Sequence, residues 1–221
     1  MPQETVKIVK QNVIFCEGVD ERNFLIYYLN SEEMKEYPIF SNDIQVIDFG
    51  GNEELKSKLE LLRISPGFNQ IKFLFIIRDA ESDAKKAVAQ IRSSLRKNGL
   101  PVPKGPGEWE SAEDGITIGF LLFPTCDDTA DAGTLEDLCL SILKQPDHFT
   151  MTEEIHKFLE HLRREYQREF PHEHKTKLHT YFSITDKFIG MKIGEAANAQ
   201  AFDWNSPNLE FLKNFLLKMA P

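Results

Sequence analysis

The segment Val13-Ile14-Phe15-Cys16-Glu17-Gly18-Val19-Asp20-Glu21 joins an apolar run directly to a glycine and a group of acids. A short apolar run that ends at a glycine is typical of a strand buried inside a sheet. The residues that follow, 20–29, have the composition of a short helix. The segment therefore predicts a β-strand over 6–16, then a helix, with acidic side chains at the junction.

The same order of strand and helix repeats through about residue 145. Further strands are expected over 44–49, 71–77 and 116–123, and the third is apolar almost throughout, as in strands covered on both faces. Helices are expected after Asn52, which can act as an N-cap, and after residue 83, where apolar residues recur at helical spacing. Strands that alternate with helices predict an α/β fold with a mostly parallel, four-stranded sheet flanked by helices.

The pattern changes after residue 148 and becomes purely helical. Helices are expected over 152–170, over 174–185 and from Ser206-Pro207, where the serine can cap the helix and the proline fits its first turn. We therefore expect an α/β core over residues 1–148 and a helical C-terminal extension over 149–221, packed on the same domain.

Composition places the chain among globular proteins, with 41% hydrophobic and 28% charged residues. No apolar run approaches the roughly 20 residues that span a bilayer, and the first residues lack the pattern of a secretory signal. Cys16, Cys126 and Cys139 show no CxxC spacing and are expected to be reduced, mostly buried thiols. These features predict a cytoplasmic protein that does not act at a membrane.

The net charge of −9 argues against a protein that coats duplex DNA by electrostatics alone. It is compatible with an enzyme that acts on nucleic acid. Carboxylates gathered at a metal site make the total more negative, and bound divalent cations would offset part of that charge.

Acidic residues follow three of the expected strands. They are Glu17, Asp20 and Glu21, then Asp79, Glu81 and Asp83, and finally Glu136 and Asp137, after a loop with Asp127, Asp128 and Asp131. Because the carboxyl ends of parallel strands share one edge of a sheet, these clusters are expected to converge there. Carboxylate oxygens are the ligands that Mg²⁺ and Mn²⁺ prefer. The alternative is that the acids are solvated in loops and first helical turns.

Basic residues are the other half of a phosphoryl-transfer site, because the transition state is anionic. The candidates are Arg78, next to Asp79, and Lys175 and Lys177 in the helical extension; for each of them the ordinary exposure of lysine and arginine favours a solvated surface charge. The stretch His172-Glu173-His174 lacks the ligand spacing of a zinc site, so exposed polar positions are expected there. Trp109 and Trp204 either stack on bases or hold the core and loops together.

Two of these stretches resemble the motifs of Toprim domains. The stretch from Ile14 to Leu25 resembles the first motif, a strand that ends in Glu-Gly and is followed by an acid, and Asp79-Ala80-Glu81 resembles the Asp-x-Asp motif. The stretch 47–51 resembles the glycine turn after the second Toprim strand. Gly133-Thr134-Leu135-Glu136 resembles the extra acidic motif of OLD-type (overcoming lysogenization defect) nucleases. Over nearly its whole length the chain is similar to a small stand-alone bacterial group of Toprim-like domains of unknown function.

The resemblance implies a role for each matching residue. It implies Glu17 and Asp79 as catalytic residues, and as ligands of Mg²⁺ or Mn²⁺ it implies Glu17, Glu21, Asp79, Glu81 and Glu136. Glu21 and Glu81 stand where the family usually has aspartate. Further candidates in the same clusters or beside them are Asp20, Asp83, Asp137, Arg78, Lys175 and Lys177.

The implied function is Mg²⁺-dependent phosphoryl transfer by a nuclease or related enzyme that acts on DNA or RNA. The alternative is a catalytically inactive metal-binding or regulatory module of the same fold that acts through a protein partner. No GxxxxGK[ST] motif of an ATPase accompanies the acids. A receiver-type phosphoacceptor domain also has acids at strand ends, but its acid pair precedes the phosphoacceptor strand, and the helical extension has no place in it.

Overall fold

The computed structural model describes residues 6–37, 43–51, 54–113, 115–126, 129 and 131–219. Structural statements below refer to these residues. The expected cap Asn52 and the loop acids Asp127 and Asp128 lie outside them.

The described residues form a five-stranded sheet in the order β2-β1-β3-β5-β4. Its strands are β1 (Asn12–Cys16), β2 (Ile44–Asp48), β3 (Phe73–Asp79), β4 (Trp109–Ser111) and β5 (Thr117–Phe123). β1 pairs in parallel with β2 and β3, and β3 pairs in parallel with β5, so the expected mostly parallel sheet is confirmed.

The expected number of four strands is wrong, because β4 adds a short antiparallel edge to β5. Three residues are too few to show the alternation by which a strand is recognised in a sequence. The first strand is also shorter than expected and begins at Asn12 rather than residue 6.

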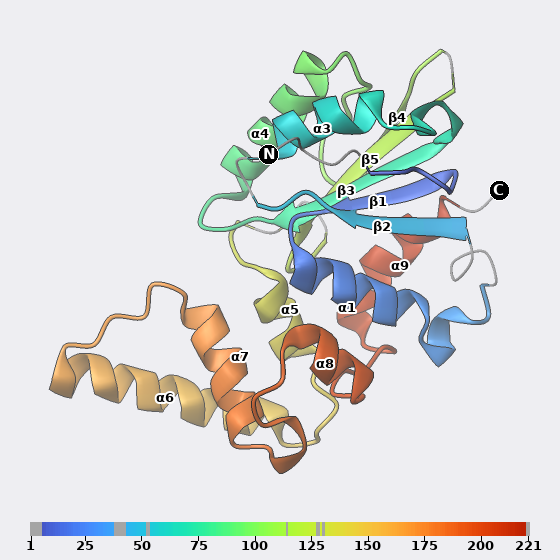
Figure 1. Ribbon diagram of the computed structural model, residues 1–221. Coiled ribbons are helices and arrows are strands. Elements are labelled where there is room, and N and C mark those ends of the chain that lie inside the picture. Colours follow the sequence, from blue (N-terminus) through green and yellow to red (C-terminus); the bar gives the residue numbers. More distant parts are fainter. Residues whose placement is uncertain are drawn as a thin grey trace.

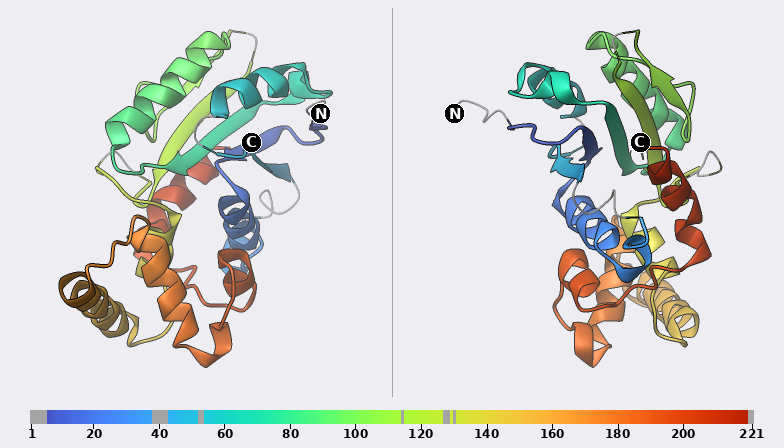
Figure 2. Two further views of the ribbon diagram at one scale, coloured as in Figure 1. Left: turned by 60° about the vertical axis from the view of Figure 1, so that its left-hand side comes forward. Right: turned by 90° about the vertical axis from the view of Figure 1, so that its right-hand side faces the viewer.

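Helices cover both faces of the sheet (Figures 1 and 2). On one face lie α3 (Leu55–Ile64) and α4 (Ala84–Lys97), and on the other lie α1 (Val19–Leu29), α5 (Leu135–Ser141) and α9 (Glu210–Leu217). Alternate residues of a strand point to opposite faces. Val13 and Phe15 accordingly join the buried cluster under α3 and α4, while Ile14 and Cys16 join the cluster on the other side. The inner strands β1, β3 and β5 are therefore apolar over most of their length, as the sequence indicated for β3.

The C-terminal part of the chain is helical, as expected. Its helices are α6 (His148–Tyr166), α7 (Glu173–Ser183), α8 (Ile193–Asn198) and α9, and the short 3-10 turns of the chain are η1 (Glu32–Met34), η2 (Phe68–Gln70), η3 (Asp186–Phe188) and η4 (Pro207–Leu209). α8, which the sequence analysis did not predict, packs on α1, with Gly194 so close to Asn23 that a Cβ would lie 2.7 Å from the asparagine Cβ. α6 and α7 lie side by side and project from the body of the molecule (Figure 1).

Both tryptophans take part in packing. Trp109 stacks on Phe215 of α9 with ring centroids 4.4 Å apart, and Phe215 also contacts Phe75 of β3. Trp204 packs against Phe24 and Tyr28 of α1. These contacts join the helical extension to the sheet and to α1.

The cysteines are buried, as expected from the sequence. Cys16, Cys126 and Cys139 are buried thiols. Among the described residues, no helix has the length and apolar character needed to cross a bilayer.

Candidate functional site

A cavity of about 410 Å³ lies where β1 and β3 end, between the edge of the sheet and the first turn of α7. Carboxylates from every predicted acidic cluster line it: Glu17, Asp20, Glu21, Asp79, Glu81 and Glu136. Asp48, from the end of β2, lines it as well. The parallel sheet thus brings acids that are far apart in the sequence to one place, as the sequence analysis predicted.

Glu17 follows β1 directly and is held by both neighbouring strand ends. Its backbone carbonyl accepts hydrogen bonds from the N–H groups of Gly50 and Gly51 at 2.9 and 3.0 Å. Its carboxylate Oε2 accepts a hydrogen bond from the backbone N–H of Asp79 at 3.4 Å and lies 3.5 Å from Nε of Arg78. Burial raises the pKa of Glu17 to about 7, and Arg78 opposes this rise. A carboxyl group with this pKa can take up or release a proton near neutral pH.

Asp79 is the last residue of β3 and is only 8% exposed. Its Oδ1 accepts a hydrogen bond from the backbone N–H of Leu135, the first residue of α5, at 2.9 Å. Glu136, the next residue of α5, is 5% exposed and lines the same cavity. Burial raises the pKa of Asp79 well above its usual range, and the charges of Glu21, Glu17 and Glu136 add to this effect. The first turn of α5 therefore completes a buried group of acids around Asp79.

Arg78 is buried beneath this group, with 2% of its surface exposed. Its Nε donates to the backbone carbonyl of Asp79 at 3.3 Å, and its Nη1 donates to Oε1 of Gln90 on α4 at 2.9 Å. Burial lowers the pKa of Arg78, while Glu17 opposes this change. Arg78 therefore acts as an internal counter-ion for Glu17 rather than as a group that reaches a substrate.

Glu81 lies at the exposed rim of the cavity and has left-handed backbone geometry, with φ of 58°. Its N–H donates to the carbonyl of Gly133 at 2.9 Å, and its own carbonyl accepts from the N–H of Gly133 at 2.7 Å. Gly133 has φ of +123°, and a Cβ there would lie 2.8 Å from Cδ of Pro124. This tight bridge ties the Asp79-Ala80-Glu81 segment to the loop that leads into α5.

Glu21 and Asp20 are in the first turn of α1, and Glu21 folds back toward Gly18. A Cβ on Gly18 would lie 2.8 Å from Oε2 of Glu21, so glycine makes room for this carboxylate. Burial raises the pKa of Glu21, and the charges of Glu136 and Asp20 contribute to the rise. In the described part of the chain, no three His, Cys, Asp or Glu side chains are arranged closely enough to hold a metal ion.

Lys175 and Lys177, both on α7, have different surroundings. Nζ of Lys175 lies 3.5 Å from Oε1 of Glu136 and lines the cavity. Burial lowers the pKa of Lys175, but the contact with Glu136 and the charges of Asp79 and Glu21 together outweigh this and raise it above the ordinary value. Lys177 instead pairs with Glu173 at 2.7 Å and lies outside the residues that line the cavity.

Two of the candidate acids cap helices instead of lining the cavity. Asp83 Oδ1 accepts from the backbone N–H of Lys86 at 3.0 Å and caps α4. Asp137 Oδ2 accepts from the backbone N–H of Thr134 at 2.9 Å, in the capping box that opens α5.

Three titratable side chains that line the cavity were not among the predicted site residues. Asp48 pairs with Arg22 at 2.6 Å, and its place at the end of a strand before Gly50 and Gly51 was an available signal. His172 and His174, expected at exposed polar positions, also line the cavity. The spacing of these two histidines in the sequence does not predict a site, because only the packing of α7 brings them to the cavity.

The fold and the cavity define an α/β protein with an acidic site at the carboxyl edge of a mostly parallel sheet. The chain belongs to the family described as protein of unknown function (DUF3226), whose model matches residues 11–220. Membership of a family of unknown function was expected and is confirmed. Neither a curated protein nor a solved structure matches the chain.

Proposed function

We propose that this chain is a Toprim-type, Mg²⁺- or Mn²⁺-dependent phosphoryl-transfer enzyme that cleaves nucleic acid. The observation that carries the proposal is the convergence of Glu17, Asp79 and Glu136 on one cavity although each is largely removed from water. Carboxylates withdrawn from water are unfavourable as anions unless a cation or a proton compensates them. Such a group is typical of sites that work with a divalent cation.

The donor atoms fit a hard divalent cation. All of the acidic groups offer carboxylate oxygens, and Mg²⁺ usually binds one or two carboxylates and keeps several waters. A closed cage of three side chains is therefore not required. One or two of the carboxylates of Glu17, Glu21, Asp79 and Glu136 would bind the ion directly and the others would face its waters, with Glu81 at the rim. When bound, Mg²⁺ would polarise the phosphate and offset the charge that builds up in the transition state.

Side chains of the protein would carry out proton transfer, positioning and phosphate binding. Burial raises the pKa of Glu17 to about 7 in the metal-free protein, so Glu17 is suited to transfer a proton as general acid or base where a neighbouring carboxylate binds the ion. Arg78 holds the carboxylate of Glu17 beside Asp79. Lys175 supplies an ammonium group at the opposite wall, where it can contact a phosphate oxygen.

The proposal is tested by incubating the purified chain with single-stranded DNA, duplex DNA and RNA in Mg²⁺ or Mn²⁺. Cleavage that is lost in Glu17→Gln and in Asp79→Asn supports it. Asp83→Asn is a matched control, because this acid caps α4 and asparagine caps helices equally well. Unchanged cleavage in the Glu17→Gln variant would refute the proposed catalytic role.

One observation favours the alternative of an inactive regulatory module of the same fold. Arg78 and Lys175 each lie 3.5 Å from a cavity carboxylate, so the protein's own cations compensate part of the acidic charge. Such a module would bind a protein partner and catalyse nothing. Cleavage of nucleic acid by the purified chain alone would exclude it.

A further inference from the structure

The first turn of α7 places nitrogen-bearing side chains opposite the carboxylates. His172, His174 and Lys175 all line the cavity, and the two imidazole rings have centroids 6.1 Å apart. The Lys175 side chain is 54% exposed although its Nζ lies 3.5 Å from Glu136. This edge of the cavity is therefore polar, carries a positive charge and is accessible from solvent.

The orientation of this turn is fixed from the opposite side of α7. The carboxylate of Glu173 is bonded by Arg163 of α6 and by Lys177 one turn along α7. These contacts lower the pKa of Glu173 to about 2. Leu178 and Phe182 of the same helix are buried in the core. With Glu173 turned toward α6, its neighbours His172, His174 and Lys175 are left on the side of the cavity.

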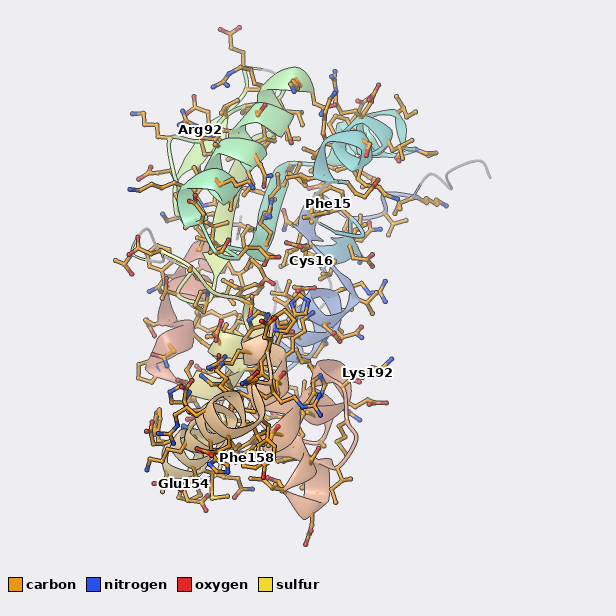
Figure 3. All side chains as sticks on the ribbon, turned by 90° about the vertical axis from the view of Figure 1, so that its left-hand side faces the viewer. Phe15, Cys16, Arg92, Glu154, Phe158 and Lys192 are labelled. Carbon is orange, nitrogen blue, oxygen red and sulfur yellow. The ribbon has the colours of Figure 1, made fainter. Side chains whose placement is uncertain are left out.

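The helices α6 and α7 lie beside the cavity. Figure 3 is a view from this side of the molecule, and the buried Cys16, the residue before Glu17, is labelled near its middle. α6, which carries Glu154 and Phe158, lies below it in the same view. Because His172, His174 and Lys175 line the cavity, a ligand that fills it contacts the start of α7.

The dimensions of the cavity limit what can reach the acids. A volume of about 410 Å³ suits a group the size of one nucleotide and not a length of duplex. Asp79 and Glu136, only 8% and 5% exposed, lie at its floor, where the stiff backbone of a double helix does not reach. A single strand is flexible enough to lower one phosphate into the cavity.

We infer that His172, His174 and Lys175 form a phosphate-binding edge that receives single-stranded nucleic acid beside the carboxylates. The inference rests on the proposed function and names its substrate class. Imidazole and ammonium groups donate hydrogen bonds to phosphate oxygens, and a charged contact of this kind is among the stronger ones in proteins.

The test is the affinity of the full chain for a short, fluorescently labelled single-stranded DNA, measured by anisotropy in Ca²⁺. Wild type is expected to bind the single strand more tightly than its duplex. Lys175→Met should weaken binding by about tenfold, as for the loss of one charged contact. It should also reduce the slope of log affinity against log salt by about 0.7, as expected for one phosphate contact on a single strand. The double variant His172→Ala, His174→Ala should bind at least about fivefold more weakly, consistent with the loss of two hydrogen bonds.

Two matched controls come from the same chain. Lys213 also pairs with a glutamate but lies on α9, and His179 is on α7 outside the residues that line the cavity. Lys213→Met and His179→Ala should bind the strand as wild type does. An unchanged salt slope in Lys175→Met would overturn the inference, since a lysine that only compensates Glu136 makes no phosphate contact. Tighter binding of the duplex, or no binding by wild type, would overturn it as well.

The two proposals fail in different ways. A chain that cleaves nucleic acid, but binds the strand equally well with and without Lys175, refutes the phosphate-binding edge alone. A chain that binds the strand through Lys175, but cleaves nothing in Mg²⁺ or Mn²⁺, refutes the enzyme and supports the binding edge.

Discussion

The carboxylate of Asp79 accepts a hydrogen bond from the backbone N–H of Leu135 at 2.9 Å, and this bond joins the end of β3 to the start of α5. Because Glu136 is the next residue, the bond also sets the position of a second acid. From the other side, Glu17 reaches the backbone N–H of Asp79 at 3.4 Å. Asp79 is therefore the residue through which three acidic segments, distant in the sequence, are held together.

The contribution of the hydrogen bond to Leu135 can be measured separately from that of the negative charge of Asp79. An asparagine at this position still offers an oxygen to the Leu135 N–H, whereas alanine does not. We expect Asp79→Ala to be less stable to urea than Asp79→Asn by about 1 kcal/mol, the usual contribution of a buried hydrogen bond. Both variants should lose Mg²⁺ binding. Equal stability of the two would contradict the structural role given to this bond.

Stability in the absence of metal should depend on pH through Glu17. The folded protein raises the pKa of Glu17 from 4.5 to about 7, so in this interval the native state binds more protons than the unfolded state. The free energy of unfolding in EDTA should therefore fall as pH rises through this interval, by up to about 3 kcal/mol from Glu17.

The Glu17→Gln variant isolates this contribution. In EDTA its free energy of unfolding, measured by urea denaturation from about pH 5 to about pH 8, should vary less steeply than that of wild type. At neutral pH the variant should be the more stable protein even though it lacks activity. The same pH dependence in both proteins would mean that burial does not disfavour the Glu17 anion.

The bridge between Glu81 and Gly133 should matter for the site as well as for stability. In Gly133→Ala the new methyl group meets Pro124 at 2.8 Å and the backbone is strained at φ of +123°. We expect a loss of about 1–3 kcal/mol in stability and weaker Mg²⁺ binding.

Gly190→Ala is the control for backbone strain alone, since Gly190 also has positive φ but has open space around its Cβ position. This variant should lose some stability and keep its Mg²⁺ affinity. If the two variants bind Mg²⁺ equally well, the bridge has no part in shaping the site.

Glu173 should affect ligand binding without touching the ligand. Glu173→Gln weakens the contacts with Arg163 and Lys177 that orient the first turn of α7. Binding of single-stranded DNA should weaken by about threefold, while Mg²⁺ affinity stays unchanged. Glu210→Gln removes a comparable exposed ion pair, with Lys213, and should change neither quantity. Loss of Mg²⁺ affinity in Glu173→Gln would instead place α7 in the metal site itself.

The same contacts predict a response to acid. Because the pKa of Glu173 is lowered to about 2, its contribution to stability is present above the ordinary value of 4.5 and is lost as pH falls toward 2. Wild type and Glu173→Gln should therefore converge in stability under acidic conditions, as measured by thermal unfolding.

Much of the fold could be predicted because local pattern determines it. The apolar runs of β1 and β3 follow from a sheet covered on both faces, and leucines at helical spacing marked α3, where Leu55, Leu59 and Leu62 are buried. β4 and α8 could not be predicted, because elements this short are specified by their tertiary neighbours.

The site could be predicted only where topology determines it. Glu17 and Asp79 follow strands, so a parallel sheet places them at one edge. Asp83 and Asp137 also follow strands, yet their carboxylates cap helices. For Asp137 the threonine three residues earlier is the pattern of a capping box and predicts this role, whereas no such pattern marks Asp83. His172 and His174 reach the cavity through the packing of α7, and no local pattern encodes that.

The most direct test of the acidic site is calorimetric titration of the full chain with Mg²⁺ and Mn²⁺, beside the double variant Glu17→Gln, Asp79→Asn. If these carboxylates hold a divalent cation, wild type releases or takes up heat on saturable binding, and the double variant does not. The absence of binding in wild type, or equal binding in both proteins, would contradict a metal site at this edge of the sheet.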